Sequence, residues 1–519
     1  MTRLMKTFKL FLIIYMVVYP SGPVRAANRN FVLEEATISG IHAAMKSGQL
    51  TSRQLTEMYL KRIASYDKKG PALNAIIFLN PHALELADEL DAKFKKSGFV
   101  GPLHGIPIII KDNLDTKDMP TTAGSLSLEG FIPPDDAFIV KKLRQAGAII
   151  VGKGNLHEFA FGSETISSLG GQTLNPYDLT RTPGGSSGGP AAAIAANFGA
   201  VAIGTDTGNS IRSPASSNNL IGIRPTLGLI SRAGIVPNSS GQDTAGPLTR
   251  TVSDAALLMD ILVGYDPEDS ITAWGVGNTP KSYQSFLDRK GLQKARLGVL
   301  KCFFGKGEEP DQVNAVMGKA IEAMKKQGAV IIPLEEQIDS KTIADTNMSR
   351  YETQDELNQY LQKMGVLAPV KSLEEIIASG KYHKRIEEGI KNRHELSKND
   401  LEYKERLIRR IKLQNNFMKM MADHQLDAII YPHQTYLVSK VGKGGMGSNG
   451  LYIALLGFPS IAVPVGFSRP TQEAPLGVPI GMEIVGRPWT DSLLIKLAYA
   501  FEQATKWRRP PSSTPPLDR

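Results

Sequence analysis

Two glycine-rich segments each place a serine where its hydroxyl could attack a carbonyl carbon. The first, "RTPGGSSGGP", carries Ser186 and Ser187 between two pairs of glycines, and the second, "GTDTGNSIR", carries Ser210 after a tight turn. A serine hydroxyl is a weak nucleophile until a neighbouring base takes its proton. Consecutive backbone N–H groups in a tight turn can form a nest that stabilises an oxyanion. The second segment therefore offers both a nucleophile and an oxyanion hole.

The first segment also fits the nucleophile elbow of α/β-hydrolases, because Gly184–Gly188 reads G-x-S-x-G. That motif needs a strand directly before the serine, and Pro183 is a poor end for a central strand. It also needs a histidine base further along the chain. Four histidines follow, and none has a sequence context typical of a general base: His383, His394, His424 and His433. We therefore favour a different base.

The best candidate for that base is Lys111, which ends the apolar run "IPIIIK". A lysine buried in an apolar site loses the hydration of its charge, so its pKa falls and it can accept a proton near pH 7. The alternative is an ordinary surface lysine at the end of a strand, and spacing alone leaves both interpretations open. Asp112, the next residue, either orients Lys111 or caps the following turn.

Alternating helices and strands predict the framework that must hold these residues. The β-branched run at Ile106–Ile110 is typical of a buried strand, and helix-then-strand patterns predict further strands at Ala148–Gly152 and Ala200–Gly204. Short apolar runs at Leu297–Lys301 and Val330–Leu334 predict two more. Such alternation indicates an α/β architecture.

One segment differs in composition from the rest of the chain. Residues 268–420 are richer in charge and poorer in glycine, and we expect them to be mostly helical from residue 350 onward. We predict a single large domain, residues 27–519, whose core comprises about 27–267 and 421–509. The helical segment at 268–420 would then form a lid or channel that selects the substrate.

Composition and charge exclude several classes of function. The 519 residues carry 60 Lys and Arg against 51 Asp and Glu, a formal charge of +9, and 42% are hydrophobic, as in an ordinary globular protein. The basic residues alternate with acidic or apolar ones, which is typical of a solvated helix face, and no nucleic-acid-binding signature is present. No P-loop occurs and the eight histidines form no close metal-ligand pair, so we predict no metal, no cofactor and no nucleic-acid partner.

Cys302, the single cysteine, is expected to be structural.

The N-terminus has the three-part form of a secretory signal peptide. A basic start is followed by the apolar run Leu10–Tyr19 and by small residues at Val24–Ala26, where cleavage is expected. The apolar run is short for a bilayer span, so an uncleaved membrane anchor is the weaker alternative. We therefore predict a signal peptide over residues 1–26, export to the periplasm or medium, and no stable membrane insertion after cleavage.

Five blocks of sequence resemble the amidase signature family. They read "GPLHGIPIIIKDN", "PGGSSGGPAAAIAA", "GTDTGNSIRSPAS", "GIRPTLGLISRAGIVP" and "DTAGPLTRTVSDAALLMD". Closer similarity to stand-alone bacterial peptide amidases and plant amidases comes from "SRAGIVPNSSGQDTAGP" and "LAYAFEQATKWRRPP". The resemblance extends from about Phe31 to Arg509 and implies one large α/β domain, with a twisted mixed β-sheet surrounded by helices and a helical substrate-channel segment.

The same resemblance implies a Ser–cis-Ser–Lys triad. Its lysine falls on Lys111, its cis-serine on Ser186 and its nucleophile on Ser210. In the implied mechanism neutral Lys111 takes a proton from Ser186, Ser186 takes one from Ser210, and Ser210 attacks the amide carbonyl to form an acyl-enzyme. The oxyanion is expected to rest on the backbone N–H groups of Thr207, Gly208, Asn209 and Ser210.

Four further residues match family blocks and are either supports of the triad or members of ordinary structural hydrogen bonds: Ser187, Asp206, Arg212 and Asp243. One residue departs from the family pattern, because Asn209 stands where glycine usually precedes the nucleophile. Asparagine tolerates left-handed backbone conformations better than most residues. We therefore expect the turn to keep its shape.

The favoured function is hydrolysis of a linear carboxamide to a carboxylate and ammonia or an amine. The resemblance admits peptide C-terminal amides, aryl or aliphatic acylamides and fatty acid amides as substrates, and these residues specify neither the natural amide nor an oligomeric state. One alternative is the glutaminase subunit of a tRNA-dependent amidotransferase, which shares the triad but needs cytoplasmic partner subunits and tRNA. Another is a catalytically silent binding protein on the same fold, against which the intact Lys111, Ser186 and Ser210 argue.

Overall fold

One large mixed β-sheet forms the centre of the protein. The computed structural model describes residues 31–444 and 447–517, and within those residues eleven strands form a single sheet in the order β1-β3-β2-β6-β8-β7-β12-β13-β11-β9-β10. The strands are β1 Ile76–Leu79, β2 Pro107–Lys111, β3 Ile149–Gly154, β6 Val201–Asp206, β7 Ile221–Arg224, β8 Thr244–Thr249, β9 Arg296–Leu300, β10 Val330–Leu334, β11 Ala428–Pro432, β12 Ser460–Phe467 and β13 Pro479–Val485. Two short strands pair separately, β4 Ile166–Ser167 and β5 Gly171–Gln172.

Parallel and antiparallel pairs divide the sheet into regions. Strand β2 runs parallel to β3 and to β6, and β9 runs parallel to β11 and to β10. The strands between these two groups pair antiparallel through β8, β7, β12 and β13. All residues of β2, β3 and β6 are buried, which agrees with their nearly continuous apolar sequences. The sheet is therefore the twisted mixed sheet that the family resemblance implies.

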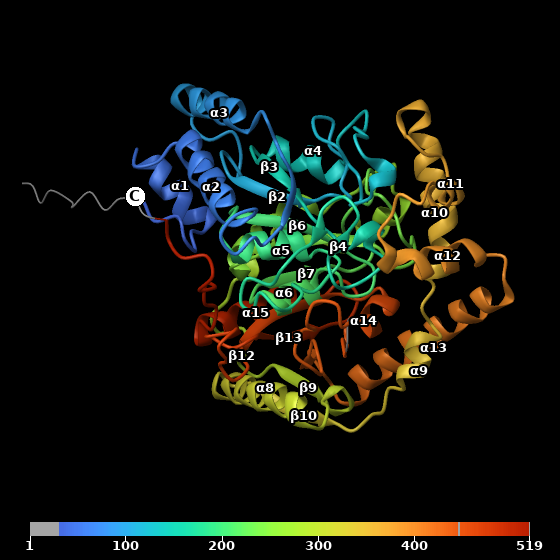
Figure 1. Cartoon of the computed structure of the whole chain (residues 1–519). Helices are drawn as coiled ribbons and strands as arrows, with labels where there is room; N and C mark the ends of the chain where they lie inside the picture. The colour runs from blue at the N-terminus through green and yellow to red at the C-terminus, as the bar shows by residue number, and fades with distance from the viewer. Residues whose placement is uncertain (1–30, 445–446, 518–519) are drawn as a thin grey trace, which may run out of the picture. The chain divides into compact units, whose positions relative to one another are not determined.

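Helices surround this sheet (Figure 1). They are α1 Ile38–Lys46, α2 Ser52–Tyr66, α3 Ala83–Ser97, α4 Phe138–Gln145, α5 Gly188–Ala195, α6 Arg212–Ser217, α7 Val252–Leu262, α8 Glu308–Lys326, α9 Ser340–Ala344, α10 Ser349–Lys363, α11 Leu373–Ser379, α12 Glu387–Glu395, α13 Leu401–Asp423, α14 Leu451–Leu456 and α15 Asp491–Thr505. Several of them begin at a residue whose side chain caps the helix. Thr37 accepts a hydrogen bond from the backbone of Gly40, and Thr51 forms a capping box with Gln54.

Helix α5 lies against β2, β3 and β6 and is wholly buried. Its sequence, GGPAAAIA, consists of small residues that let a helix approach a sheet closely. A Cβ atom on Gly189 would lie 2.2 Å from the carbonyl oxygen of Asn155, so this position admits only glycine. The glycines and alanines after the double serine therefore bring the start of α5 onto the ends of the parallel strands.

The segment 268–420 has two structurally different parts. Strands β9 and β10 extend the central sheet, with α8 between them in sequence, so this part belongs to the framework. Helices α10, α11 and α12 then pack on the core through an apolar cluster that includes Leu357, Ile376, Ile390 and, from the core, Phe159. In Figure 1 helices α10 to α13 lie together on the side away from α1, α2 and α3. The predicted role of this segment in choosing the substrate stays a prediction.

The predicted signal peptide, residues 1–26, lies outside the described residues. Among the helices that the structure does describe, none has the length and apolar character needed to cross a membrane.

Candidate active site

Lys111 is the last residue of β2, and its side chain is completely buried. Its Nζ donates a hydrogen bond to Ser186 Oγ at 2.8 Å and another to Thr205 Oγ1 at 2.7 Å. Burial lowers the pKa of Lys111 to about 7, although the more distant carboxylates of Asp206 and Asp243 oppose that shift. Burial therefore makes the neutral lysine accessible near pH 7, and this is the state in which its nitrogen can accept a proton.

Ser186 lies in the turn between Gly184 and helix α5, and the Gly185–Ser186 peptide bond is cis. The turn is held from two sides. Thr165 Oγ1 donates to the carbonyl of Gly184 at 2.7 Å, and the N–H of His157 donates to the carbonyl of Ser186 at 3.1 Å. In the described chain no strand precedes this turn directly, so the geometry of a nucleophile elbow is lacking.

Ser210 lies between the end of β6 and the start of α6. The backbone N–H of Ser187 donates to the carbonyl of Ser210 at 3.2 Å, which joins the two serine segments. Ser210 also lines an open cleft of about 220 Å³, together with Thr207, Gly208 and Asn209. The structure thus brings Lys111 and Ser186 into direct contact. Within residues 31–444 and 447–517 it contains no hydrogen bond between the hydroxyls of Ser186 and Ser210.

The turn Thr207–Ser210 leaves its backbone donors available. Among the described residues, no protein atom accepts a hydrogen bond from the four N–H groups of this turn. The backbone φ of Asn209 is outside the left-handed region, so the tolerance of asparagine for that region does not account for the shape of this turn. The Asn209 side chain donates to Ser448 Oγ at 2.9 Å.

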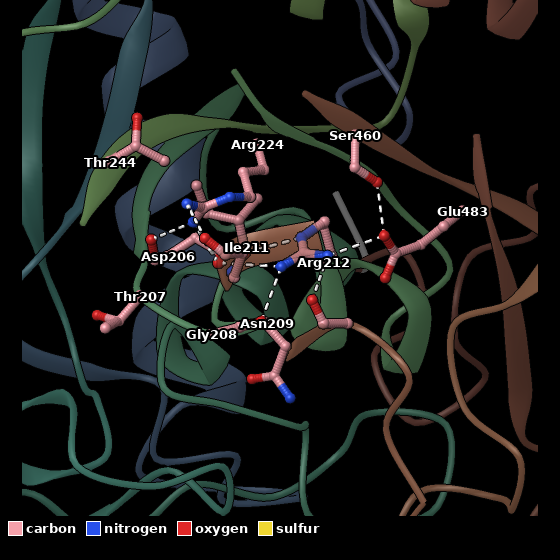
Figure 2. Close-up of polar contacts among 12 residues, drawn as sticks. Asp206, Thr207, Gly208, Asn209, Ile211, Arg212, Arg224, Thr244, Ser460 and Glu483 are labelled. Atoms are coloured by element: carbon pink, nitrogen blue, oxygen red, sulfur yellow. Dashed lines mark hydrogen bonds and ion pairs between the residues drawn. The ribbon is translucent and has the colours of Figure 1, made fainter. Parts of the chain in front are cut away.

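A buried ion-pair network fixes the start and end of the same turn (Figure 2). Asp206 accepts hydrogen bonds from the N–H of Ile211 at 3.1 Å, from Arg212 Nε at 3.1 Å and from Arg224 Nη1 at 2.8 Å. Burial alone would raise the pKa of Asp206, but the two guanidinium groups hold it well below its usual value. Asp206 and Arg212 therefore tie the strand before the turn to the helix after it.

Arg212 extends this network in two directions. It donates to the carbonyl of Gly208 at 2.9 Å, within the turn, and to Glu483 Oε2 at 2.8 Å, on strand β13. Burial would raise the pKa of Glu483, yet Arg212 and His433 lower it to about 2. Ser460 adds a hydrogen bond to the same carboxylate at 2.6 Å. Arg212 thus attaches the turn to strand β13, in the antiparallel part of the sheet, and its positive charge is paired with the carboxylates of Asp206 and Glu483.

The other two predicted supports contact the site through threonines. Ser187 Oγ donates to the carbonyl of Thr205 at 3.0 Å, and Thr207 Oγ1 donates to Asp243 Oδ1 at 2.5 Å. Asp243 is in turn held by the backbone N–H groups of residues 238 and 239, each at 2.8 Å. The Ser187 hydroxyl therefore holds the backbone of strand β6 at Thr205, the residue that contacts Lys111. Asp243 holds the turn at Thr207.

Sequence reasoning missed three residues of this region. Thr205 contacts Lys111 directly, Asn113 donates to Thr205 Oγ1 at 3.1 Å, and Arg224 completes the pairing of Asp206. For Thr205, the order of strands in the sheet could have indicated the contact with Lys111. Because β2 and β6 are parallel neighbours, residues near their C-terminal ends lie side by side, and one of them is a threonine.

Side chains that could bind a metal ion do not converge on the site. In the residues that the structure describes, no group of three or more His, Cys, Asp or Glu side chains is arranged to hold a metal ion.

A buried lysine is hydrogen-bonded to the serine of a cis peptide bond, and a second serine lies close by in an open cleft, which is the arrangement that the resemblance led us to expect. Residues 54–495 match the family described as Amidase, which covers most of the chain. The chain belongs to this family, and it is a hydrolase of the amidase-signature type. The large mixed sheet with surrounding helices is the fold of that class.

Relatives of this chain include amidases and a subunit of an amidotransferase. The chain is 37% identical to a probable amidase of Arabidopsis thaliana, over 93% of this chain and 92% of that protein. It is 36% identical to a glutamyl-tRNA(Gln) amidotransferase subunit of Thermoanaerobacter pseudethanolicus, over 93% of this chain and 99% of that protein. Among solved structures, native peptide amidase from Stenotrophomonas maltophilia is 36% identical and superposes with a TM-score of 0.83, covering 92% of this chain and 98% of that one.

Proposed function

We propose that this protein hydrolyses a linear carboxamide to a carboxylate and ammonia or an amine, through an acyl-enzyme on Ser210. The observation that carries the proposal is the 2.8 Å hydrogen bond between the fully buried Lys111 Nζ and Ser186 Oγ. Ser210 lies on the adjoining turn and faces the cleft. A lysine with a pKa of about 7 can act as a base at neutral pH.

In the proposed mechanism neutral Lys111 takes the proton of Ser186 while Ser186 takes the proton of Ser210. Ser210 Oγ then forms a bond to the amide carbon, and the carbonyl oxygen becomes an oxyanion beside the free N–H groups of Thr207–Ser210. The relay returns the proton to the amide nitrogen as the C–N bond breaks. Water enters by the reverse sequence, releases the carboxylate and restores Ser210. The missing bond between the two serines would form in the substrate complex, where catalytic hydrogen bonds commonly tighten.

The proposal is tested on the purified protein with a panel of primary amides, measured by ammonia release. Ser210→Ala should abolish hydrolysis and labelling by a fluorophosphonate. Ser187→Ala should retain both in part, because the Ser187 hydroxyl contacts only the backbone of Thr205 among the described residues. Labelling that survives Ser210→Ala but is lost in Ser187→Ala would refute the assignment of the nucleophile.

A second candidate function is the glutaminase subunit of a tRNA-dependent amidotransferase. It is favoured by the 36% identity to a protein named as a glutamyl-tRNA(Gln) amidotransferase subunit, over nearly the full length of both chains. The two functions predict different behaviour of the isolated protein. A stand-alone amidase hydrolyses simple amides without partners, whereas a glutaminase subunit would act on glutamine and copurify with other subunits.

We also propose that the protein is exported, on the basis of the basic start, apolar run and small-residue site in residues 1–26. Expression with a C-terminal tag, followed by fractionation and N-terminal sequencing, tests this. Export predicts a mature chain that begins near Ala27 outside the cytoplasm. Full-length protein confined to the cytoplasm would refute export and would favour the amidotransferase interpretation.

A further inference from the structure

The cleft that contains Ser210 has a single charged residue in its described lining, and that residue is a cation. Arg393, on helix α12, lines the cleft and is only 7% exposed. Its Cζ lies 4.1 Å from the ring centroid of Phe161, which lines the same cleft. The remaining lining residues in the described chain are uncharged, among them Asn238, Gln242 and Ser349. Arg393 therefore places a positive charge in the cleft that also contains the proposed nucleophile.

Arg393 forms no salt bridge with a described residue, and among the buried arginines it shares this only with Arg250, which instead donates to the backbone carbonyls of Ile194, Gly199 and Ala36. Arg212 and Arg224 both pair with Asp206, and Arg62 pairs with Glu34 at 2.8 Å. For the Arg393 side chain the only hydrogen bond within residues 31–444 and 447–517 goes from Nη1 to the carbonyl of Gly389 at 2.9 Å. Its Nε is buried without a partner. A buried charge without a partner is costly, so its presence in a cleft needs an explanation.

The charge is retained despite this cost. Burial, followed by repulsion from Arg350, lowers the pKa of Arg393 to about 9, which still leaves the guanidinium protonated at neutral pH. The edge formed by Nε and Nη2 has no acceptor among the described residues. A guanidinium edge of this kind matches the two oxygens of a carboxylate. The group that would complete the site is thus an anion delivered by the ligand.

We propose that Arg393 binds a carboxylate of the substrate, so that the preferred amides carry a second, anionic end in addition to the amide that is cleaved. This inference rests on the proposed amide hydrolysis and names its substrate class: small amides with a free carboxylate, such as the monoamides of dicarboxylic acids. The cation–π contact with Phe161 holds the guanidinium in place, and the aliphatic part of the substrate would lie along the uncharged lining toward Ser210.

The experiment compares monoamides of dicarboxylic acids of three to six carbons with alkyl amides in which a methyl group replaces the carboxylate. For at least one chain length, the wild-type kcat/KM for the anionic amide should exceed that for its neutral partner by about 10- to 100-fold, the range of a charge-assisted hydrogen bond. In Arg393→Met this ratio should fall to about one, mainly through KM. Arg393→Lys, which keeps the charge but not the planar fork, should give an intermediate ratio.

Arg350→Met is the matched control, because it removes a neighbouring positive charge that lies outside the described cleft lining. It should preserve the preference for anionic amides. If both variants lost the preference for the anionic amide equally, the preference would come from the overall positive charge of the region and not from a carboxylate bound to Arg393, and the proposal would be wrong. It would also be wrong if Arg393→Met left the ratio of kcat/KM values unchanged. Circular dichroism and thermal melting establish that each variant is folded.

Calorimetry with the Ser210→Ala protein separates this inference from the proposed function. The anionic monoamide should bind to Ser210→Ala, and the added Arg393→Met substitution should weaken binding about 10-fold or more. Hydrolysis of neutral amides with no anionic preference refutes the carboxylate site alone. Absence of hydrolysis for every amide refutes the proposed function, and the calorimetric comparison still decides the role of Arg393.

Discussion

Two completely buried lysines occupy neighbouring parallel strands, and only one of them contacts a serine. Lys111 ends β2 and Lys153 lies near the end of β3, where it is in register with Ile110. Because side chains alternate along a strand, the two lysines point to opposite faces of the sheet. Each has a threonine hydroxyl close to Nζ, Thr205 at 2.7 Å from Lys111 and Thr121 at 3.0 Å from Lys153.

The two lysines differ in what their Nζ atoms contact besides a threonine hydroxyl. Lys111 Nζ contacts Ser186 Oγ, whereas Lys153 Nζ lies 3.6 Å from the buried carboxylate of Asp112 and donates to the carbonyl of Leu114 at 2.6 Å. Burial lowers the pKa of both lysines, but around Lys153 the nearby Asp112 and Asp115 oppose the shift at close range. Burial alone therefore does not make a base in this site, because Lys153 lies beside a carboxylate and a backbone carbonyl rather than beside a serine hydroxyl.

Replacement of Lys111 is expected to give the largest effect on activity. Lys111→Met removes the proposed base and should lower kcat/KM for any accepted amide by about 100- to 10,000-fold. The buried amine compensates no carboxylate in direct contact, so the melting temperature should stay close to that of the wild type. Steady-state kinetics and calorimetric melting on the same sample check both statements. Activity within tenfold of the wild type would place the base elsewhere.

Replacement of Lys153 should give the opposite pattern. Lys153→Met leaves Asp112 buried without its cation, and loss of one partner of a buried pair costs about 3–5 kcal/mol of unfolding free energy. Urea unfolding measures that cost, and kcat per fluorophosphonate-titrated site should remain within about threefold of the wild type. The double variant Lys153→Met with Asp112→Asn should regain part of the lost stability. If Lys153→Met instead abolished turnover in folded protein, the contrast between the two lysines would fail.

The pH dependence of the reaction should report Lys111 alone. With a pKa of about 7, Lys111 is mostly protonated at pH 6 and mostly neutral at pH 8. Since only the neutral form accepts a proton, kcat/KM should rise about tenfold for each pH unit below 7 and level off above it. The same acid limb should persist in Lys153→Met. A profile that is flat between pH 5.5 and 8.5 would contradict the proposed base.

Much of the framework could be predicted from local sequence, because strand and helix patterns are short-range. The run at Ile106–Ile110 forms β2 within one residue, and the runs after residues 148 and 200 form β3 and β6. The order of strands could not be predicted, since β9 and β10 join the far edge of the sheet through contacts with β11. Family resemblance, rather than spacing, favoured Lys111, because the run that ends in Lys153 is also apolar.

Partners of buried charges were the least predictable part of the site. Asp112 follows Lys111 in sequence, yet it pairs with Lys153 and accepts the N–H of Gly124 at 3.2 Å, so it caps the next turn rather than orienting Lys111. Arg393 lies in a segment of ordinary alternating charge, and nothing local shows that its side chain lacks a carboxylate. Such pairings depend on which strands and helices meet, and they are decided only by the tertiary fold.

The two threonines offer the smallest and most selective test of the comparison. Thr205 Oγ1 accepts a hydrogen bond from Lys111 Nζ, and a bond to the charged form raises the pKa of a lysine. Thr205→Val should therefore lower the pKa of Lys111, which moves the acid limb of kcat/KM to lower pH by less than about one unit. It should also reduce the plateau by about three- to tenfold, because Nζ loses one of its two side-chain contacts.

Thr121→Val makes the same change beside Lys153 and serves as the control. It should leave the acid limb in place and cost about 1 kcal/mol of stability, the usual contribution of one buried hydrogen bond. Full pH–rate profiles of both variants, measured with one neutral amide, decide the matter. An equal shift in the two profiles would show that the substitutions act through the packing of the sheet. A shift confined to Thr205→Val identifies Lys111 as the titrating group, since Lys153 on the opposite face retains its threonine in that variant.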